Sequence, residues 1–178
     1  MKKLVFIVLC MMNSSVVLAS DWNVKTNPIS LLIGATNAEV NYAVHDHFTI
    51  GLGGLVWSTE ILDIEFTASE YHARFDYWFH ESFKQGWYIG AQVSKITMDL
   101  STKVSGVKFS GDISSTGYLG QFGYHWQWDH FNIDFGTYAG YYSFDPNIEL
   151  TDSAGNIEKE TVPAFGAVGA EFFIGWAF

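Results

Sequence analysis

The stretch AFGAVGAEFFIGWAF, Ala164–Phe178, alternates between two faces without interruption. One face carries Phe172, Ile174, Trp176 and Phe178, and the other carries Glu171 among mostly small residues. A period of two over this length predicts a β-strand. The strand is longer than an ordinary globular strand and ends on an aromatic carboxy terminus. This combination is typical of a strand that crosses a lipid bilayer.

The amino terminus has the features of a secretory signal. Lys2 and Lys3 precede the apolar run Leu4–Met12, and Val17-Leu18-Ala19 supplies small residues for cleavage after Ala19. Nine apolar residues are too few for a membrane-spanning helix, which needs about 20. Cys10 does not fit a lipid-attachment site, because Leu9 precedes it where a small residue is needed. We therefore expect a signal peptide over 1–19 and one mature domain over 20–178.

Removing the signal changes the composition in two ways. The chain loses its one cysteine, so no disulfide or thiol chemistry is expected in the mature protein. It also loses two of its nine basic residues and none of its 19 acidic ones. The resulting negative charge argues against nucleic acid as a partner.

Seven further segments repeat the pattern of an alternating strand followed by a polar break, and they are Asn27–Gly34, Asn37–Val44, Phe48–Trp57, Ala68–Phe79, Trp87–Val104, Val107–Gln127 and Phe131–Tyr142. Ser58–Glu65 and Ser143–Val162 are interpreted as loops, and Ser105-Gly106 as a turn. The first pair is the least regular, because its apolar parity switches near Ala35-Thr36. The order predicts an all-β fold, an eight-stranded antiparallel up-and-down transmembrane barrel.

Alternation alone does not decide which face lies inside the barrel. A soluble lipocalin-like barrel turns its apolar face inward, and an outer-membrane barrel does the reverse. Here the polar face also carries many glycines, including Gly51, Gly90, Gly123 and Gly136. Glycine weakens an exposed strand but fits the crowded interior of a narrow barrel. The polar face is therefore predicted to line the lumen.

Aromatic residues gather at strand ends, as they do at the two interfaces of a membrane. Trp87, Trp126, Trp128 and Trp176 lie near the predicted short turns or the carboxy terminus. Tyr141, Tyr142 and Phe144 are candidates for the opposite aromatic girdle. A closed sheet leaves no unpaired edge in hydrocarbon, where each unsatisfied backbone group costs several kcal/mol.

The signal, the eight amphipathic strands and the terminal aromatic pattern resemble small outer-membrane barrels of the OmpA/OmpX-like superfamily. The resemblance implies a location in the cell outer membrane, with lipid and lipopolysaccharide as surroundings. It further implies that Phe172, Ile174, Trp176 and Phe178 form the signal read by the barrel-assembly machinery. No peptidoglycan-binding domain follows the barrel in this sequence, so anchoring to the cell wall is not expected.

A set of polar residues shares lumen parity on neighbouring strands, namely Glu39, His72, Arg74, Asp76, Gln92, Gln121, His125, Asn132, Asp134 and Glu171. Arg74 is the one arginine of the chain. Buried charge is tolerated only when it is paired and hydrogen-bonded, so we expect Arg74 to pair with Glu39, Asp76, Asp134 or Glu171. Such a network is interpreted as a plug that stiffens the barrel, with a narrow proton or solute path as the alternative.

Enzyme chemistry is the next alternative, because some small outer-membrane barrels deacylate or palmitoylate lipid A. That chemistry needs a serine, a histidine and an acid near the outer rim. His45, His47, His80 and His130 fall in the predicted inner turns, His125 lies near that end, and only His72 is mid-barrel. We therefore predict no catalytic residues and no enzymatic role. The histidines flanking Asp46 and Asp129 lack the spacing of a closed metal site, so no metal or cofactor is expected.

The outer loops suggest contacts at the cell surface. Lys95, Lys103 and Lys108 lie on one hairpin, where they are candidates for contact with lipopolysaccharide phosphates or simply for solvation. The last loop carries several acidic residues without the spacing of an EF-hand, and its alternation suggests strands that turn near Ser153–Asn156. A protruding sheet exposes edges to which another chain can add, which suggests an adhesion-like role with an extracellular protein partner.

Overall fold

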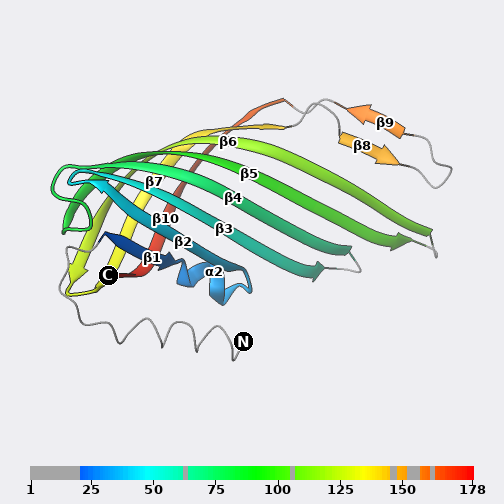
Figure 1. Cartoon of the computed structure of the whole chain (residues 1–178). Helices are drawn as coiled ribbons and strands as arrows, with labels where there is room; N and C mark the ends of the chain where they lie inside the picture. The colour runs from blue at the N-terminus through cyan, green and yellow to red at the C-terminus, as the bar shows by residue number, and fades with distance from the viewer. Residues whose placement is uncertain (1–20, 62–63, 105–106, 145–147, 152–156, 161–162) are drawn as a thin grey trace.

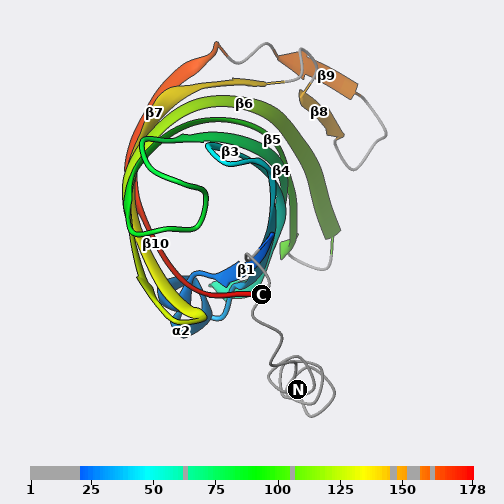
Figure 2. The same cartoon turned by 60° about the vertical axis from the view of Figure 1, so that its left-hand side comes forward.

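The computed structural model describes residues 21–61, 64–104, 107–144, 148–151, 157–160 and 163–178, and the predicted signal peptide lies outside them. Eight antiparallel strands close into one barrel, as predicted (Figure 2). They are β1 (Trp22–Thr26), β2 (Thr36–His45), β3 (Phe48–Ile61), β4 (Ile64–Trp78), β5 (Gly86–Val104), β6 (Val107–Trp128), β7 (Phe131–Phe144) and β10 (Phe165–Ala177). Each strand pairs with its neighbour in sequence, and β1 pairs with β10 to complete the ring.

The barrel is inverted in polarity relative to a water-soluble one. Its outer surface carries exposed apolar side chains from every part of the wall, including Leu52, Phe75, Ile89, Phe122 and Val168. The largest set of buried side chains is instead polar or charged and faces the lumen. Alternation along each strand produces this division, because neighbouring residues point to opposite faces of the sheet.

The outward apolar band ends at tyrosines on the outer side. Tyr71, Tyr118 and Tyr141 are exposed there, and Tyr118 and Tyr141 lie with ring centroids 5.3 Å apart. On β6 Trp126, near the short turns, lies eight positions after Tyr118. That span is about 27 Å along a strand, or roughly 20 Å across a barrel whose strands tilt by about 40°. The band therefore approaches the height that outer-membrane barrels present to lipid.

The prediction of a strand over Asn27–Gly34 is wrong. Helix α2 (Pro28–Leu32) occupies this segment, and the first strand, β1, lies earlier in the chain. The side chain of Asn27 caps the helix by accepting hydrogen bonds from the backbone N–H groups of Ile29 and Ser30. Gly34 follows with φ 85°, a conformation that favours glycine. Among the described residues, no helix is long and apolar enough to cross a membrane.

The prediction of a loop over Ser58–Glu65 is also wrong, because β3 and β4 continue through much of it. With β5 and β6 they form a four-stranded extension that runs past the ends of β1 and β2 (Figure 1). We call this four-stranded part, beyond Val56 of β3, the outer sheet. The polar residues that suggested a loop alternate with inward-facing Trp57 and Thr59, so they form the outward face of a strand.

The predicted loop Ser143–Val162 contains two short strands, β8 (Ile148–Thr151) and β9 (Ile157–Glu160). They pair with each other in a separate sheet, and β8 lies against β6. The predicted turns at Ser105-Gly106 and Ser153–Asn156 lie outside the described residues.

The short-turn end of the barrel is closed by the turn between β4 and β5, which curls across the ring of strands (Figure 2). Phe83 in this turn is buried and packs against Trp78 with ring centroids 5.7 Å apart. Ser82 ties the turn to the neighbouring one, because its hydroxyl donates to the carbonyl of His45 and its N–H to that of Asp46. Aromatic packing therefore narrows this mouth of the lumen.

Candidate functional site

The lumen holds a continuous layer of charged and polar side chains between the aromatic closure and the outer sheet. The structure places every member of the predicted lumen set on the inward face, and all but His72 are buried. It also adds residues that the sequence did not single out, namely Asn23, Lys25 and Tyr88.

Lys25 forms the inner part of this network. Its Nζ lies 3.0 Å from Oε1 of Glu39 and 3.1 Å from Oδ2 of Asp134. Asp134 also accepts a hydrogen bond from Nδ1 of His125, whose Nε2 lies 2.9 Å from Oε1 of Gln127. Four strands of the barrel are thereby joined through one buried ammonium group and its partners.

Arg74 forms the centre. Its Nε donates to both carboxylate oxygens of Asp76 at 2.8 and 2.9 Å, and its Nη1 donates to Oε1 of Glu171 at 3.1 Å. Glu39 is a more distant partner at 4.0 Å, and the guanidinium group lies 5.2 Å from the ring centroid of Tyr88. Three of the four predicted partners therefore contact Arg74. The fourth, Asp134, pairs with Lys25 and His125 instead.

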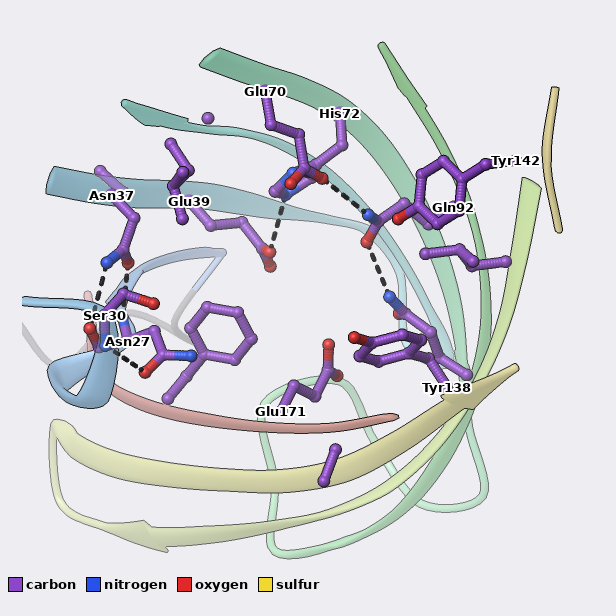
Figure 3. A pocket seen from close by; sticks show the side chains of 17 residues that line it. Asn27, Ser30, Asn37, Glu39, Glu70, His72, Gln92, Tyr138, Tyr142 and Glu171 are labelled. Carbon is purple, nitrogen blue, oxygen red and sulfur yellow. Dashed lines mark hydrogen bonds and ion pairs between the residues drawn. The ribbon is translucent and has the colours of Figure 1, made fainter. Parts of the chain in front are cut away.

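His72 and two glutamines form the outer part. Nε2 of His72 lies 3.1 Å from Oε2 of Glu39, and Nδ1 lies 3.4 Å from Oε1 of Glu70. Nε2 of Gln121 donates to Oε1 of Gln92 at 2.7 Å. Together with α2 and β10 these residues surround a cavity of about 220 Å³ (Figure 3).

Glycines make room for these side chains. A Cβ atom on Gly51 would collide with Oδ1 of Asn41, and one on Gly90 would collide with Oδ1 of Asp76. On Gly123 it would collide with the hydroxyl of Tyr88. The glycine-rich polar face therefore lines a lumen that is filled by polar side chains rather than by water alone.

The aromatic residues divide between the two faces of the barrel. Trp87, Trp128 and Tyr141 are exposed on the outside, and Trp126 and Trp176 are half-buried there. Tyr142 and Phe144 have lumen parity, so their assignment to an outer girdle is wrong. Tyr142 lines the cavity, as Figure 3 shows, and its ring stacks on Phe165. Phe172, Ile174, Trp176 and Phe178 lie on the outward face of the last strand, and their recognition by an assembly machinery stays a prediction.

Histidines in the short turns have structural contacts. Nδ1 of His47 lies 3.0 Å from the carbonyl oxygen of Trp78 and 2.8 Å from that of His80. Carbonyl groups only accept, so Nδ1 carries the proton and joins the two turns. His130 likewise donates from Nδ1 to the carbonyl of Ala177 at 2.8 Å. In the part of the chain that the structure describes, no group of three histidine or acidic side chains is placed to hold a metal ion.

The predicted lipopolysaccharide contacts are only partly described. Lys95 is exposed on the outward face of β5, opposite Tyr71, one of the tyrosines at the outer end of the apolar band. Lys103 and Lys108 lie opposite each other in the β5–β6 ladder, and their side chains are outside the described part.

Comparison with protein families gives one match. Residues 4–175 match the family described as "Protein of unknown function (DUF3575)". The chain belongs to the DUF3575 family. Searches of curated proteins and of solved structures gave no match to this DUF3575 chain.

Proposed function

We propose that this DUF3575 protein is an integral outer-membrane barrel with a plugged lumen, similar to the OmpA/OmpX-like superfamily, which binds a partner at the cell surface. One observation carries the binding role: the outer sheet continues beyond Tyr71, Tyr118 and Tyr141, and among the described residues Trp57–Ile61 of β3 have a partner strand on one side only. The proposal includes lipid and lipopolysaccharide as surroundings, with Lys95 near the outer interface, and the barrel-assembly machinery as the route of insertion.

Placement in a membrane is supported by the energetics of the two faces. The exposed band of large apolar side chains would be a hazard in water, where contiguous apolar patches promote association. In lipid the same side chains are stable, and the closed ladder satisfies the backbone groups that hydrocarbon cannot.

A plugged lumen is supported by the network around Arg74 and by the aromatic closure at Phe83. Both lie across an interior that eight strands already make narrow. Solute passage would require the ion pairs to separate, which leaves buried charges without partners at a cost of several kcal/mol. A structural plug therefore explains the interior better than a channel.

Among the described residues, the outer sheet has an edge on β3 that no further strand contacts, an edge on β6 against which β8 lies, and one apolar face. β2 begins opposite Val56, so residues Trp57–Ile61 of β3 pair only with β4 in the described part of the chain. On the concave face the register places Trp57, Ala68, Met98 and Ile113 in one row across the four strands. The convex face at this level is polar, with Ser58 and Asp99 exposed.

The occupant that fits this arrangement is an extended segment of a partner polypeptide. Unpaired N–H and C=O groups on an edge strand bind another strand, and alternate side chains of that strand would rest on the apolar face. A globular partner without an extended segment would use neither feature.

A matched pair of lysine variants tests this role. Thr59→Lys places a charge on the concave side of the free edge, and Ser58→Lys places the same charge on the convex side of the same strand. We expect Thr59→Lys to reduce binding of expressing cells to host cells, phage or matrix proteins by tenfold or more, since a desolvated lysine opposes strand addition. Ser58→Lys should bind nearly as the wild type. Equal binding by both variants, or none by the wild type, would refute the role.

Location and the lipid-modifying alternative have separate tests. A folded barrel from the outer-membrane fraction should change its migration on a gel when the sample is heated. We do not propose lipid modification, because both nitrogens of His72 face carboxylates of Glu39 and Glu70 rather than a serine. Mass spectrometry should show the same acyl chains on lipid A from a deletion strain as on lipid A from the wild type. An acyl modification that is lost in the deletion strain would support the lipid-modifying enzyme instead.

A further inference from the structure

The cavity in the outer half of the lumen has an excess of hydrogen-bond acceptors. Glu70 on β4, Glu171 on β10 and the paired amides of Gln92 and Gln121 line it (Figure 3). Figure 3 shows the Glu171 carboxylate pointing into the cavity, and its two bonds, from Arg74 and Tyr88, both reach Oε1.

The chemistry of Glu70 fixes the direction of both amides. An ionised carboxylate only accepts, so Gln92 presents its NH₂ group to Glu70, at 3.4 Å. The carbonyl of Gln92 then faces Gln121, which must present its own NH₂ group, at 2.7 Å. The carbonyl oxygen of Gln121 is left as the last acceptor of the chain. It has no hydrogen-bond partner, although the residue is 4% exposed and lines the cavity.

Glu70 is itself loosely held. Its two contacts, with Gln92 and with Nδ1 of His72, are both 3.4 Å long and reach the same oxygen, Oε1. Hydrogen bonds to a carboxylate are normally about 2.7–2.9 Å. A carboxylate with such long contacts retains much of its capacity to accept another donor.

Charge in the lumen points the same way. Among the described inward-facing residues, two permanent cations, Lys25 and Arg74, face five carboxylates, which are Glu39, Glu70, Asp76, Asp134 and Glu171. Lys25 and Arg74 lie on the inner side of the cavity and are already paired there. His72, between Glu39 and Glu70, adds a third cation when it is protonated. The five carboxylates outnumber the cations even then, and Glu70, which has the longest contacts, borders the cavity.

We propose that this cavity binds a small organic cation with a protonated amine, whose N–H groups donate to Glu70 and to the carbonyl oxygen of Gln121. An ammonium group has three donors and no acceptor, which matches an acceptor-rich wall. Leu55, Leu119 and Phe173 in the same wall provide contact for an alkyl chain. Ca²⁺ fits less well, because it needs six to eight oxygen ligands, whereas the NH₂ group of Gln92 and the ring of His72 stand between the carboxylates.

The test uses the full mature barrel, refolded in detergent, with putrescine as the probe and 1,4-butanediol as its neutral counterpart. Isothermal titration at constant ionic strength should show putrescine binding and no butanediol binding. Glu70→Gln should weaken putrescine binding at least tenfold, because it removes the charged acceptor. Asp129→Asn is the matched control: it removes one negative charge from an exposed turn at the opposite end and should bind as the wild type.

Three results would overturn the proposal. They are equal binding of the amine and the diol, unchanged putrescine binding in Glu70→Gln, and binding of CaCl₂ but not of putrescine that depends on Glu70. Heat-modifiable migration of each variant establishes folding, and the comparison of the two probes on the wild type needs no variant. Loss of surface binding by Thr59→Lys concerns another part of the molecule, so the two proposals fail independently.

Discussion

Lys25 and Glu39 lie directly opposite each other on β1 and β2, with Nζ and Oε1 3.0 Å apart and both side chains buried. β1 has only five residues, so it contributes few ladder bonds to the closure of the barrel. Because Lys25 also contacts Asp134 on β7, one side chain links the shortest strand of the barrel to its neighbour and to a strand across the lumen. Barrel closure at β1 therefore depends on charge as well as on backbone pairing.

Lys25→Met should lower the free energy of unfolding by roughly 3–5 kcal/mol, because it leaves two buried carboxylates without their cation. Urea titration of the protein in lipid vesicles, followed by tryptophan fluorescence, measures this change. Lys84→Met removes an exposed lysine from the β4–β5 turn and should change stability by no more than about 0.5 kcal/mol. Equal effects of the two variants would show that the buried pair contributes little.

The glycines of β6 allow a test of the lumen assignment with one methyl group. Gly123 faces inward, and its Cβ would lie 2.9 Å from the carbonyl oxygen of Phe135 and would collide with Tyr88. Gly120 faces outward, where the nearest atom to its Cβ would be 3.8 Å away. Gly123→Ala should destabilise the barrel by about 1–3 kcal/mol, and Gly120→Ala should not. A larger loss at Gly120, measured in the same urea titration, would contradict the inward assignment of the glycine face.

Most strands could be predicted from the sequence because each has one buried and one exposed face. Phe48, Ile50 and Leu52 alternate with Thr49 and Gly51, and the structure places the two sets on opposite sides of β3. The same parity placed the polar residues in the lumen. Alternation does not give the partner of each charge, however, because contacts across a barrel join strands that are distant in sequence, as Lys25 and Asp134 are.

The first strand is not apparent from the sequence, because the mainly apolar run Ile29–Ile33, interrupted by Ser30, resembles a buried strand. Helix signals were nevertheless present, since Asn27 is a good cap, Pro28 suits the first helical turn and Gly34 suits a helix end. Tyr142 was misplaced for a different reason. Its parity on β7 matches inward Asn132 and Asp134, so the strand pattern should have outweighed the preference of tyrosine for membrane interfaces.

A plugged lumen predicts that the protein conducts no ions across planar bilayers. The wild-type protein should give no stable conductance steps, because the Arg74 network and the rings of Trp78 and Phe83 block the path in two layers. Phe83→Ala removes one ring of the aromatic layer and should give no conductance either, since Trp78 and the charged layer remain. Stable steps in the wild type that disappear in Arg74→Ala or Glu171→Ala would favour the narrow path instead.

Two tryptophans report directly on which face meets lipid. Trp87 is 49% exposed on the outside of β5, whereas Trp78 is 3% exposed and donates from its indole N–H to Oγ1 of Thr49 inside the barrel. Variants that keep one of the two, with the other six tryptophans replaced by phenylalanine, would be refolded into vesicles of brominated lipid. Bromine quenches only indoles that it contacts, so Trp87 fluorescence should fall strongly and Trp78 fluorescence should persist. If both emit equally, or Trp78 is the one quenched, the apolar face does not contact acyl chains, and the membrane assignment is wrong.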